Sequence, residues 1–171
     1  GGDGSFEQAL AASHYLSAGD RGPILVGGGD EFHSVFSALF DPSVPLDETP
    51  SDGGAMLLLE PVEHASGPNL QPGYFAPAGV IPETLRAAVA HHGGPRAFNE
   101  RVGAVLIGIP AAWRRAFEPH LVPLWRELGF QGPVIDYRRY FGEFAAASAV
   151  AAAAATALLA HGAVPAALTG A

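Results

Sequence analysis

Apolar residues recur along the chain in two patterns, short unbroken runs and longer stretches with helical spacing. Unbroken runs of this length, bordered by glycine, proline or acidic residues, are typical of strands buried on both faces. Stretches with helical spacing separate these runs, so we predict an α/β fold in which helices cover both sides of a sheet. The predicted strands are residues 24–26, 55–59, 102–109 and 132–136.

Helices are predicted where apolar residues repeat every three or four positions. The first begins at Ser5, and Ser5 with Gln8 fits the capping box that opens many helices. In the helix predicted at residues 111–128, Pro119 and Pro123 are expected to kink or split the helix, because proline removes a backbone hydrogen bond. A helical turn or loop is expected at 32–40, a turn-rich segment at 41–52 and a long Pro/Gly-rich loop at 62–82. The predicted helices are residues 5–18, 82–92, 111–128 and the alanine-rich stretch after Glu143.

The alanine-rich stretch has two interpretations. Residues 144–160 carry no charge, which would suit a membrane span. A span needs about 20 strongly apolar residues, however, and alanine is barely apolar. We therefore favour a helix packed closely between two sheets, where small side chains let backbones approach. Its alanines form two stripes spaced by four, Ala149, Ala153 and Ala157, and Ala147, Ala151 and Ala155, and both are expected to face close neighbours.

Composition excludes several classes of function and of site. The 171 residues suit one domain, and a net charge of -8 argues against nucleic-acid binding. The chain has no cysteine, so it has no disulfide, thiolate metal site or thiol nucleophile. We expect no cofactor. The opening GGDGS does not read as a secretory signal, and a cytoplasmic location is the expectation.

Four segments in order carry a resemblance: LSAGDRGPILVGGGDEF, SDGGAMLLLEP, RVGAVLIGIP and YRRYFGEFAAASAVAAAAATALLAHGAVPAAL. Together they resemble the thiolase-like condensing enzymes, most closely the β-ketoacyl synthases. The resemblance implies a layered αβαβα thiolase-like fold. Residues 1–171 would form one incomplete, C-terminal-weighted fragment of that domain, with the alanine helix in or beside its central layer.

The resemblance also indicates where the family's chemistry would lie. The attacking cysteine would fall at or beside Gly2, the first catalytic histidine at Gly108 and the second at Glu143. Arg138 stands where the family has a lysine. Because all three chemical positions differ, the chain resembles a catalytically degenerate member. Relatives of that kind are the chain-length-factor type subunits and the short synthase-like proteins of aryl-polyene-type pigment clusters.

The resemblance therefore implies a non-catalytic ketosynthase-like subunit. It would pair with an active β-ketoacyl synthase, or with the missing half of its own fold, in polyketide or fatty-acid-type chain elongation. It would shape the acyl tunnel and meet acyl-carrier protein indirectly. One alternative is a thiolase-fold acyl transferase or hydrolase that uses a polar pocket of Ser5, Arg138 and Glu143. Another is a scaffold without a ligand.

Single residues leave further alternatives open. Ser5 is favoured as a helix cap over a nucleophile. Glu143 could pair with Arg138 or Arg139, but an acidic residue stabilised by the dipole at the start of the alanine helix is favoured. No metal site is expected: His91 and His92 point about 100° apart on a helix, and His33 with Asp30 and Glu31 looks more like a turn after a strand.

Overall fold

The computed structural model describes residues 5–17, 22–31, 51–61, 67–71 and 81–169. The expected turn at 32–40 and most of the 41–52 and 62–82 segments lie outside these ranges. Residues 67–71 form neither helix nor strand, as predicted. The elements are α1 (Ser5–Ser17), β1 (Ile24–Asp30), β2 (Gly53–Leu59), α3 (Ile81–His91), α4 (Gly94–Arg101), β3 (Val105–Ile107), α5 (Ala111–Glu127), β4 (Val134–Asp136), α6 (Arg138–Phe141), α7 (Ala147–His161) and a 3₁₀ turn (Ala166–Leu168).

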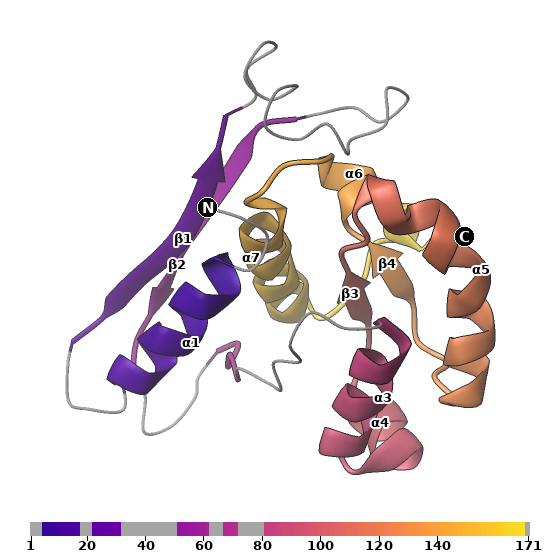
Figure 1. Ribbon diagram of the computed structural model, residues 1–171. Coiled ribbons are helices and arrows are strands. Elements are labelled where there is room, and N and C mark those ends of the chain that lie inside the picture. The colour runs from indigo at the N-terminus through magenta and orange to yellow at the C-terminus, as the bar shows by residue number, and fades with distance from the viewer. Residues whose placement is uncertain (1–4, 18–21, 32–50, 62–66, 72–80, 170–171) are drawn as a thin grey trace.

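The described strands form two separate two-stranded sheets (Figure 1). Strands β1 and β2 are antiparallel, with Ile24 opposite Leu59 and Asp30 opposite Gly53. Strands β3 and β4 are parallel, with Val105 opposite Val134. The mixed α/β class is confirmed, but the prediction of one common sheet is wrong for the described residues.

The antiparallel pair, which we call the β1–β2 ribbon, is covered on one face. Its inward face packs on α1 and α7 through Val26, which is buried, and through Leu57 and Leu59. Leu25 and Leu58 point to the opposite face, where both are exposed. Successive residues of a strand point to opposite sides, so an apolar run supplies two apolar faces. Within the described part of the chain, the prediction that helices cover both faces is therefore wrong for this ribbon.

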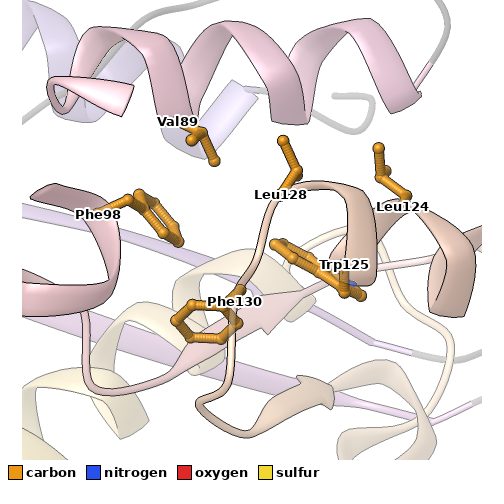
Figure 2. Close-up of a cluster of buried hydrophobic side chains, with 6 residues drawn as sticks. All are labelled: Val89, Phe98, Leu124, Trp125, Leu128 and Phe130. Atoms are coloured by element: carbon orange, nitrogen blue, oxygen red, sulfur yellow. The ribbon is translucent and has the colours of Figure 1, made fainter. Parts of the chain in front are cut away.

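A second hydrophobic core joins the helices around β3 and β4 (Figure 2). The ring of Phe130 lies 5.3 Å from that of Phe98 and 5.5 Å from that of Trp125, measured between centroids. Aromatic rings at such separations attract one another beyond the area they bury. The buried members of this core are Val89, Phe98, Leu124, Trp125, Leu128 and Phe130.

Helix α4 was missed by the sequence prediction, which placed no helix between residues 92 and 111. Gly93 and Gly94 adopt φ of 92° and 88°, which lets the chain turn between α3 and α4. Pro95 then stands in the first turn of α4, where its missing N–H has no helical partner to lose. The strand expected at 102–109 shortens accordingly to Val105–Ile107.

Helix α5 runs unbroken from Ala111 to Glu127 with Pro119 and Pro123 inside it. The expected split is therefore wrong. Both prolines are exposed and lie four residues apart, on one side of the helix. The carbonyl groups that lose a helical hydrogen bond there can bond to water instead.

The alanine helix α7 lies between the β1–β2 ribbon and the half of the molecule that contains β3 and β4 (Figure 1). A Cβ atom on Gly28 would lie 3.3 Å from the Cβ of Ala146 and 3.5 Å from that of Ala149, so helix and ribbon are in direct backbone-level contact. Ala147 and Ala149 are fully buried, whereas Ala157 is exposed. Close neighbours are thus confirmed for Ala147, Ala149 and Ala151 and wrong for Ala157.

Across the ranges that the structure describes, no helix combines the length and the apolar character needed to cross a membrane. Helix α7 ends at His161, and Gly162 with φ of 74° closes it in the left-handed conformation.

Two alanine-to-leucine substitutions test the packing of α7. Ala149→Leu adds three carbon atoms at a site without free space, and we expect it to lower the free energy of unfolding by about 1–3 kcal/mol. Ala157→Leu places the same atoms in solvent, where leucine has nearly the helix propensity of alanine. Thermal unfolding of both variants measures the difference. Equal melting temperatures would contradict the close packing of α7 on the ribbon.

Candidate functional site

Four charged side chains converge in the interior where β4, α5, α6 and the α6–α7 connection meet. Arg114, Arg138 and Glu143 are exposed by 8%, 7% and 8% respectively. The side chain of Asp136, at the end of β4, is exposed by 11%. Burying ionised groups costs several kcal/mol each unless they are paired. We call these four residues the buried charge cluster.

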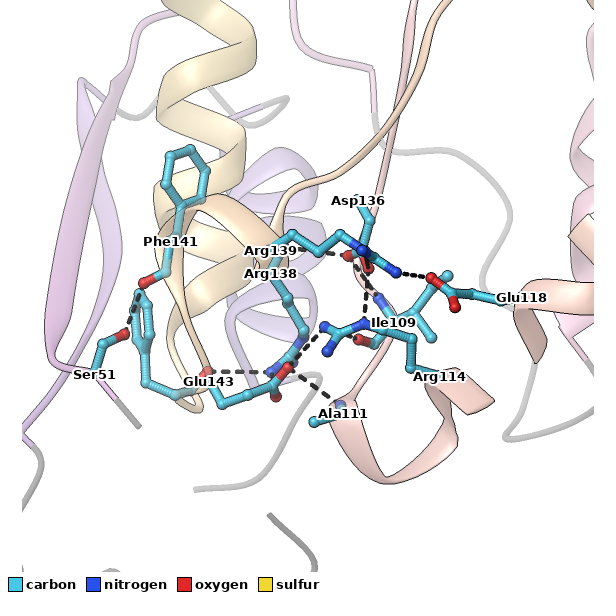
Figure 3. Close-up of polar contacts among 11 residues, drawn as sticks. Ser51, Ile109, Ala111, Arg114, Glu118, Asp136, Arg138, Arg139, Phe141 and Glu143 are labelled. Carbon is cyan, nitrogen blue, oxygen red and sulfur yellow. Dashed lines mark hydrogen bonds and ion pairs between the residues drawn. The ribbon is translucent and has the colours of Figure 1, made fainter. Parts of the chain in front are cut away.

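Glu143 uses both carboxylate oxygens within the cluster (Figure 3). Arg138 Nη1 donates to Oε2 at 3.0 Å, and Arg114 Nη2 donates to Oε1 at 3.3 Å. The backbone N–H of Ala111 also donates to Oε1, at 3.2 Å. Ala111 is the first residue of α5, so the carboxylate lies at the positive end of that helix.

The two interpretations of Glu143 can now be separated. The pairing with Arg138 is confirmed. The favoured interpretation, an acid at the start of its own helix, is wrong about the helix: α7 begins at Ala147, and the carboxylate of Glu143 instead binds the N-terminus of α5. Arg139 pairs with Glu118 and approaches Asp136 rather than Glu143.

Asp136 holds the opposite side of the cluster. Its Oδ1 accepts the backbone N–H groups of Ile109, at 3.3 Å, and Arg138, at 3.2 Å. Its Oδ2 accepts Arg114 Nε at 3.2 Å. Arg114 therefore bridges the two carboxylates, and its Nη2 also donates to Ile109 O at 3.2 Å. A guanidinium group suits this role because its donors form a rigid planar fork.

Burial raises the pKa of the Glu143 carboxyl above its ordinary value. Arg138, Arg114 and the Ala111 N–H act in the opposite direction, since each favours the ionised form. Protonation of Glu143 in the folded protein therefore occurs at higher pH than in the unfolded chain.

Gly108 lies beside the cluster, just after β3. A Cβ atom on Gly108 would fall 2.1 Å from the hydroxyl oxygen of Tyr137, so the space for a side chain is already occupied. The backbone N–H groups of Ile109 and Ala111, just after Gly108, donate to Asp136 and Glu143 respectively. The segment that follows Gly108 thus contacts Glu143, and Gly108 and Glu143 are two of the three positions that the resemblance to the condensing enzymes implies.

The remaining predicted positions lie elsewhere. Gly2 is outside the described residues. Ser5 begins α1, which packs on β1 and α7, and its side chain is outside the described part of the structure. Of the expected polar pocket of Ser5, Arg138 and Glu143, the structure therefore places Arg138 and Glu143 in contact.

The α6–α7 connection also ties the cluster to the β1–β2 ribbon. The Ser51 N–H donates to Glu143 O at 3.3 Å, and Ser51 Oγ donates to Phe141 O at 2.7 Å. On the neighbouring strand, Asp30 Oδ2 accepts the Ala145 N–H at 2.8 Å. Asp30 at the end of β1 and Ser51, two residues before β2, are therefore both bonded to the segment that carries Glu143.

Within the described ranges, no three His, Cys, Asp or Glu side chains form a group that could hold a metal ion. The rings of His91 and His92 meet edge to face with centroids 5.6 Å apart. His33, part of the other metal candidate, is outside the described residues.

Arg114 and Asp136 are the site residues that sequence reasoning missed. Arg114 is one of two adjacent arginines in an amphipathic helix, and the other, Arg115, is exposed. The sequence does not distinguish which arginine points inward. The signal for Asp136 was a carboxylate directly ending an apolar strand, a position where strand ends often place polar side chains at a site.

Comparison of the chain with protein-family models, curated proteins and solved structures finds no match.

Glu143→Gln tests the charge state of the cluster. Because the folded-state pKa lies above the ordinary value of 4.5, the contribution of Glu143 to the free energy of unfolding is largest below pH 4.5. That contribution falls as pH rises through the folded-state pKa. We therefore expect Glu143→Gln to match the wild type in acid and to be at least as stable at neutral pH. Urea unfolding of both proteins from about pH 4 to about pH 8 measures this. A wild type that gains stability over the variant as pH rises would show that attraction to the arginines outweighs burial.

Arg114→Leu tests the bridge between the carboxylates. The variant leaves Ile109 O, Asp136 and Glu143 without the donors that Arg114 supplies, and we expect a loss of about 3–5 kcal/mol. Arg115→Leu changes the same charge at the adjacent exposed position and should alter stability by less than about 0.5 kcal/mol. Chemical denaturation compares the pair, and equal losses would argue against a bridging role.

Proposed function

We propose that the chain is a non-catalytic ketosynthase-like subunit that pairs with an active β-ketoacyl synthase and helps shape its acyl tunnel. The observation that carries the proposal is the state of the two positions where the resemblance implies histidines. Gly108 has no side chain and the Glu143 carboxylate only accepts hydrogen bonds, so neither residue supplies the side-chain donor that an imidazole would. Tyr137 fills the space at Gly108, and Arg138, Arg114 and the Ala111 N–H occupy the oxygens of Glu143.

The chemistry of condensation supports a non-catalytic role. A thioester carbonyl oxygen becomes negative in the transition state, and hydrogen-bond donors must stabilise it. A carboxylate accepts hydrogen bonds and would repel that charge. The attacking group in this chemistry is a thiolate, and the chain has no cysteine. A layered αβαβα arrangement, completed by the partner, belongs to the same proposal.

The alternative, an acyl transferase or hydrolase that uses Ser5 and Glu143, has less support. A general base must reach the proton that it abstracts. The Glu143 carboxylate is buried, and both of its oxygens already accept hydrogen bonds from the cluster. These contacts suit a role in positioning chain segments.

Intact-mass measurement and product analysis test the proposal. The chain incubated with acyl-carrier protein loaded with an acyl group should acquire no acyl adduct. Co-expressed with an active β-ketoacyl synthase from its own organism, it should co-purify and change the chain length of the product. A stoichiometric adduct that is lost in Ser5→Ala would favour the alternative. Failure to associate with any such synthase, with no effect on products, would overturn the proposal.

A further inference from the structure

The face of the β1–β2 ribbon that α1 and α7 leave exposed is an apolar surface with carboxylates at its two ends. Leu25, Met56 and Leu58 are exposed by 62%, 70% and 61% on this face. Leu25 stands opposite Leu58, and Gly27 opposite Met56, so the three large side chains form one continuous patch. Isolated exposed apolar residues are common, but a contiguous patch of this kind marks an interaction site.

The rest of the same face carries almost no side chains. Gly29 stands opposite Gly54. A Cβ atom added to Gly29 would meet nothing within 4 Å, so the surface there is open backbone. The patch therefore continues into a surface of glycine backbone beside the larger side chains, and a rigid element could lie along the full length of the ribbon.

The charged residues that the structure describes at the ends of this face are all carboxylates. Glu31 and Asp52 stand at one end of the ribbon and Glu60 at the other, and all three are exposed. Asp30 belongs to the covered face, where it accepts the Ala145 N–H. Residues 22–31 and 51–61, which contain both strands, include no arginine, lysine or histidine. The apolar surface is thus bordered at both ends by carboxylates.

The carboxylates at the two ends of the ribbon indicate which kind of partner would bind to this face. Two copies of the chain that packed these faces together about a twofold axis would bring an acidic end of one against an acidic end of the other, which is unfavourable. An element with basic residues at both ends would instead be attracted. Seven residues of strand span about 23 Å, which a helix of about 15 residues matches.

We propose that the uncovered face of the β1–β2 ribbon docks an amphipathic helix of another protein, with an apolar stripe on Leu25, Met56 and Leu58 and with arginine or lysine in both terminal turns. The docked helix completes the arrangement that the apolar pattern of these strands requires, a sheet with helices on both sides. The surface is available to the partner under the proposed function, but the inference does not rest on it.

The chain offers a convenient probe for this surface, because Met56 is its single methionine. In the full chain labelled with ¹³C at the methionine methyl group, one resonance reports on the patch. The ligand is a synthetic helical peptide of about 15 residues with a leucine stripe and arginines in both terminal turns. A matched peptide carries glutamates in place of the arginines. We expect the arginine peptide to shift the Met56 resonance saturably and the glutamate peptide to leave it unchanged.

Matched variants of the chain make the test specific. Leu25→Asp, on the patch, should weaken binding of the arginine peptide about tenfold or more. Leu159→Asp, which is equally exposed on α7 and adds the same charge, should leave binding unchanged. The double variant Glu31→Arg with Glu60→Arg should reverse the preference between the two peptides. Circular dichroism of each variant confirms that it is folded.

Four results would overturn the inference. Equal binding of both peptides would show that charge does not select the partner. Unchanged binding by Leu25→Asp would show that the apolar patch is not the binding surface. A Met56 resonance that shifts with protein concentration alone would indicate a second copy on this face. Protection of Met56 from a soluble paramagnetic agent in dilute protein would indicate that another segment of the same chain covers it. Association with a synthase is measured separately by co-purification, so each proposal can fail alone.

Discussion

The short segment from Phe141 to Ala146 joins the two halves of the molecule, and the rest of the structure depends on it. Its Glu143 side chain reaches the N-terminus of α5 and the two buried arginines. Its backbone at 141, 143 and 145 bonds to Ser51, just before β2, and to Asp30 of β1. Helix α7 then begins in direct contact with Gly28. One connection thus fixes a charged interior on one side and a closely packed helix on the other.

The buried charge cluster explains why this connection can hold its place. Two arginines and two carboxylates balance one another, and backbone N–H groups at 109, 111 and 138 supply further donors. Such clusters contribute little net stability because desolvation offsets attraction, but they penalise arrangements in which a partner is missing. The cluster therefore selects one position for β4, α5 and α6 relative to one another. This role is structural, and it leaves the Glu143 carboxylate without a free oxygen for substrate chemistry.

The two proposals concern opposite parts of the molecule. The proposed non-catalytic role is supported by the interior, where the positions that resemble a catalytic site are filled or neutralised. The docking inference is supported by the surface, where the apolar pattern of β1 and β2 continues beyond the helices that cover them. A subunit that acts through association would need an exposed apolar surface for its partner. It would not need catalytic groups in its interior.

The sequence by itself determined the local elements. Helical spacing located α1, α3 and α5, the alanine-rich stretch located α7, and apolar runs located the four strands. The pairing of Glu143 with Arg138 was one of two alternatives that the sequence left open. Tertiary structure decided which strands are neighbours, which of two adjacent arginines turns inward and which helix the Glu143 carboxylate binds. The physical reason is the separation along the sequence of the residues that interact. Periodicity and capping depend on residues a few positions apart, whereas Arg114 meets Glu143 across 29 positions and Asp30 meets Ala145 across 115. An apolar run likewise states that a strand has two apolar faces, but only the packed fold shows that α1 and α7 cover one of them.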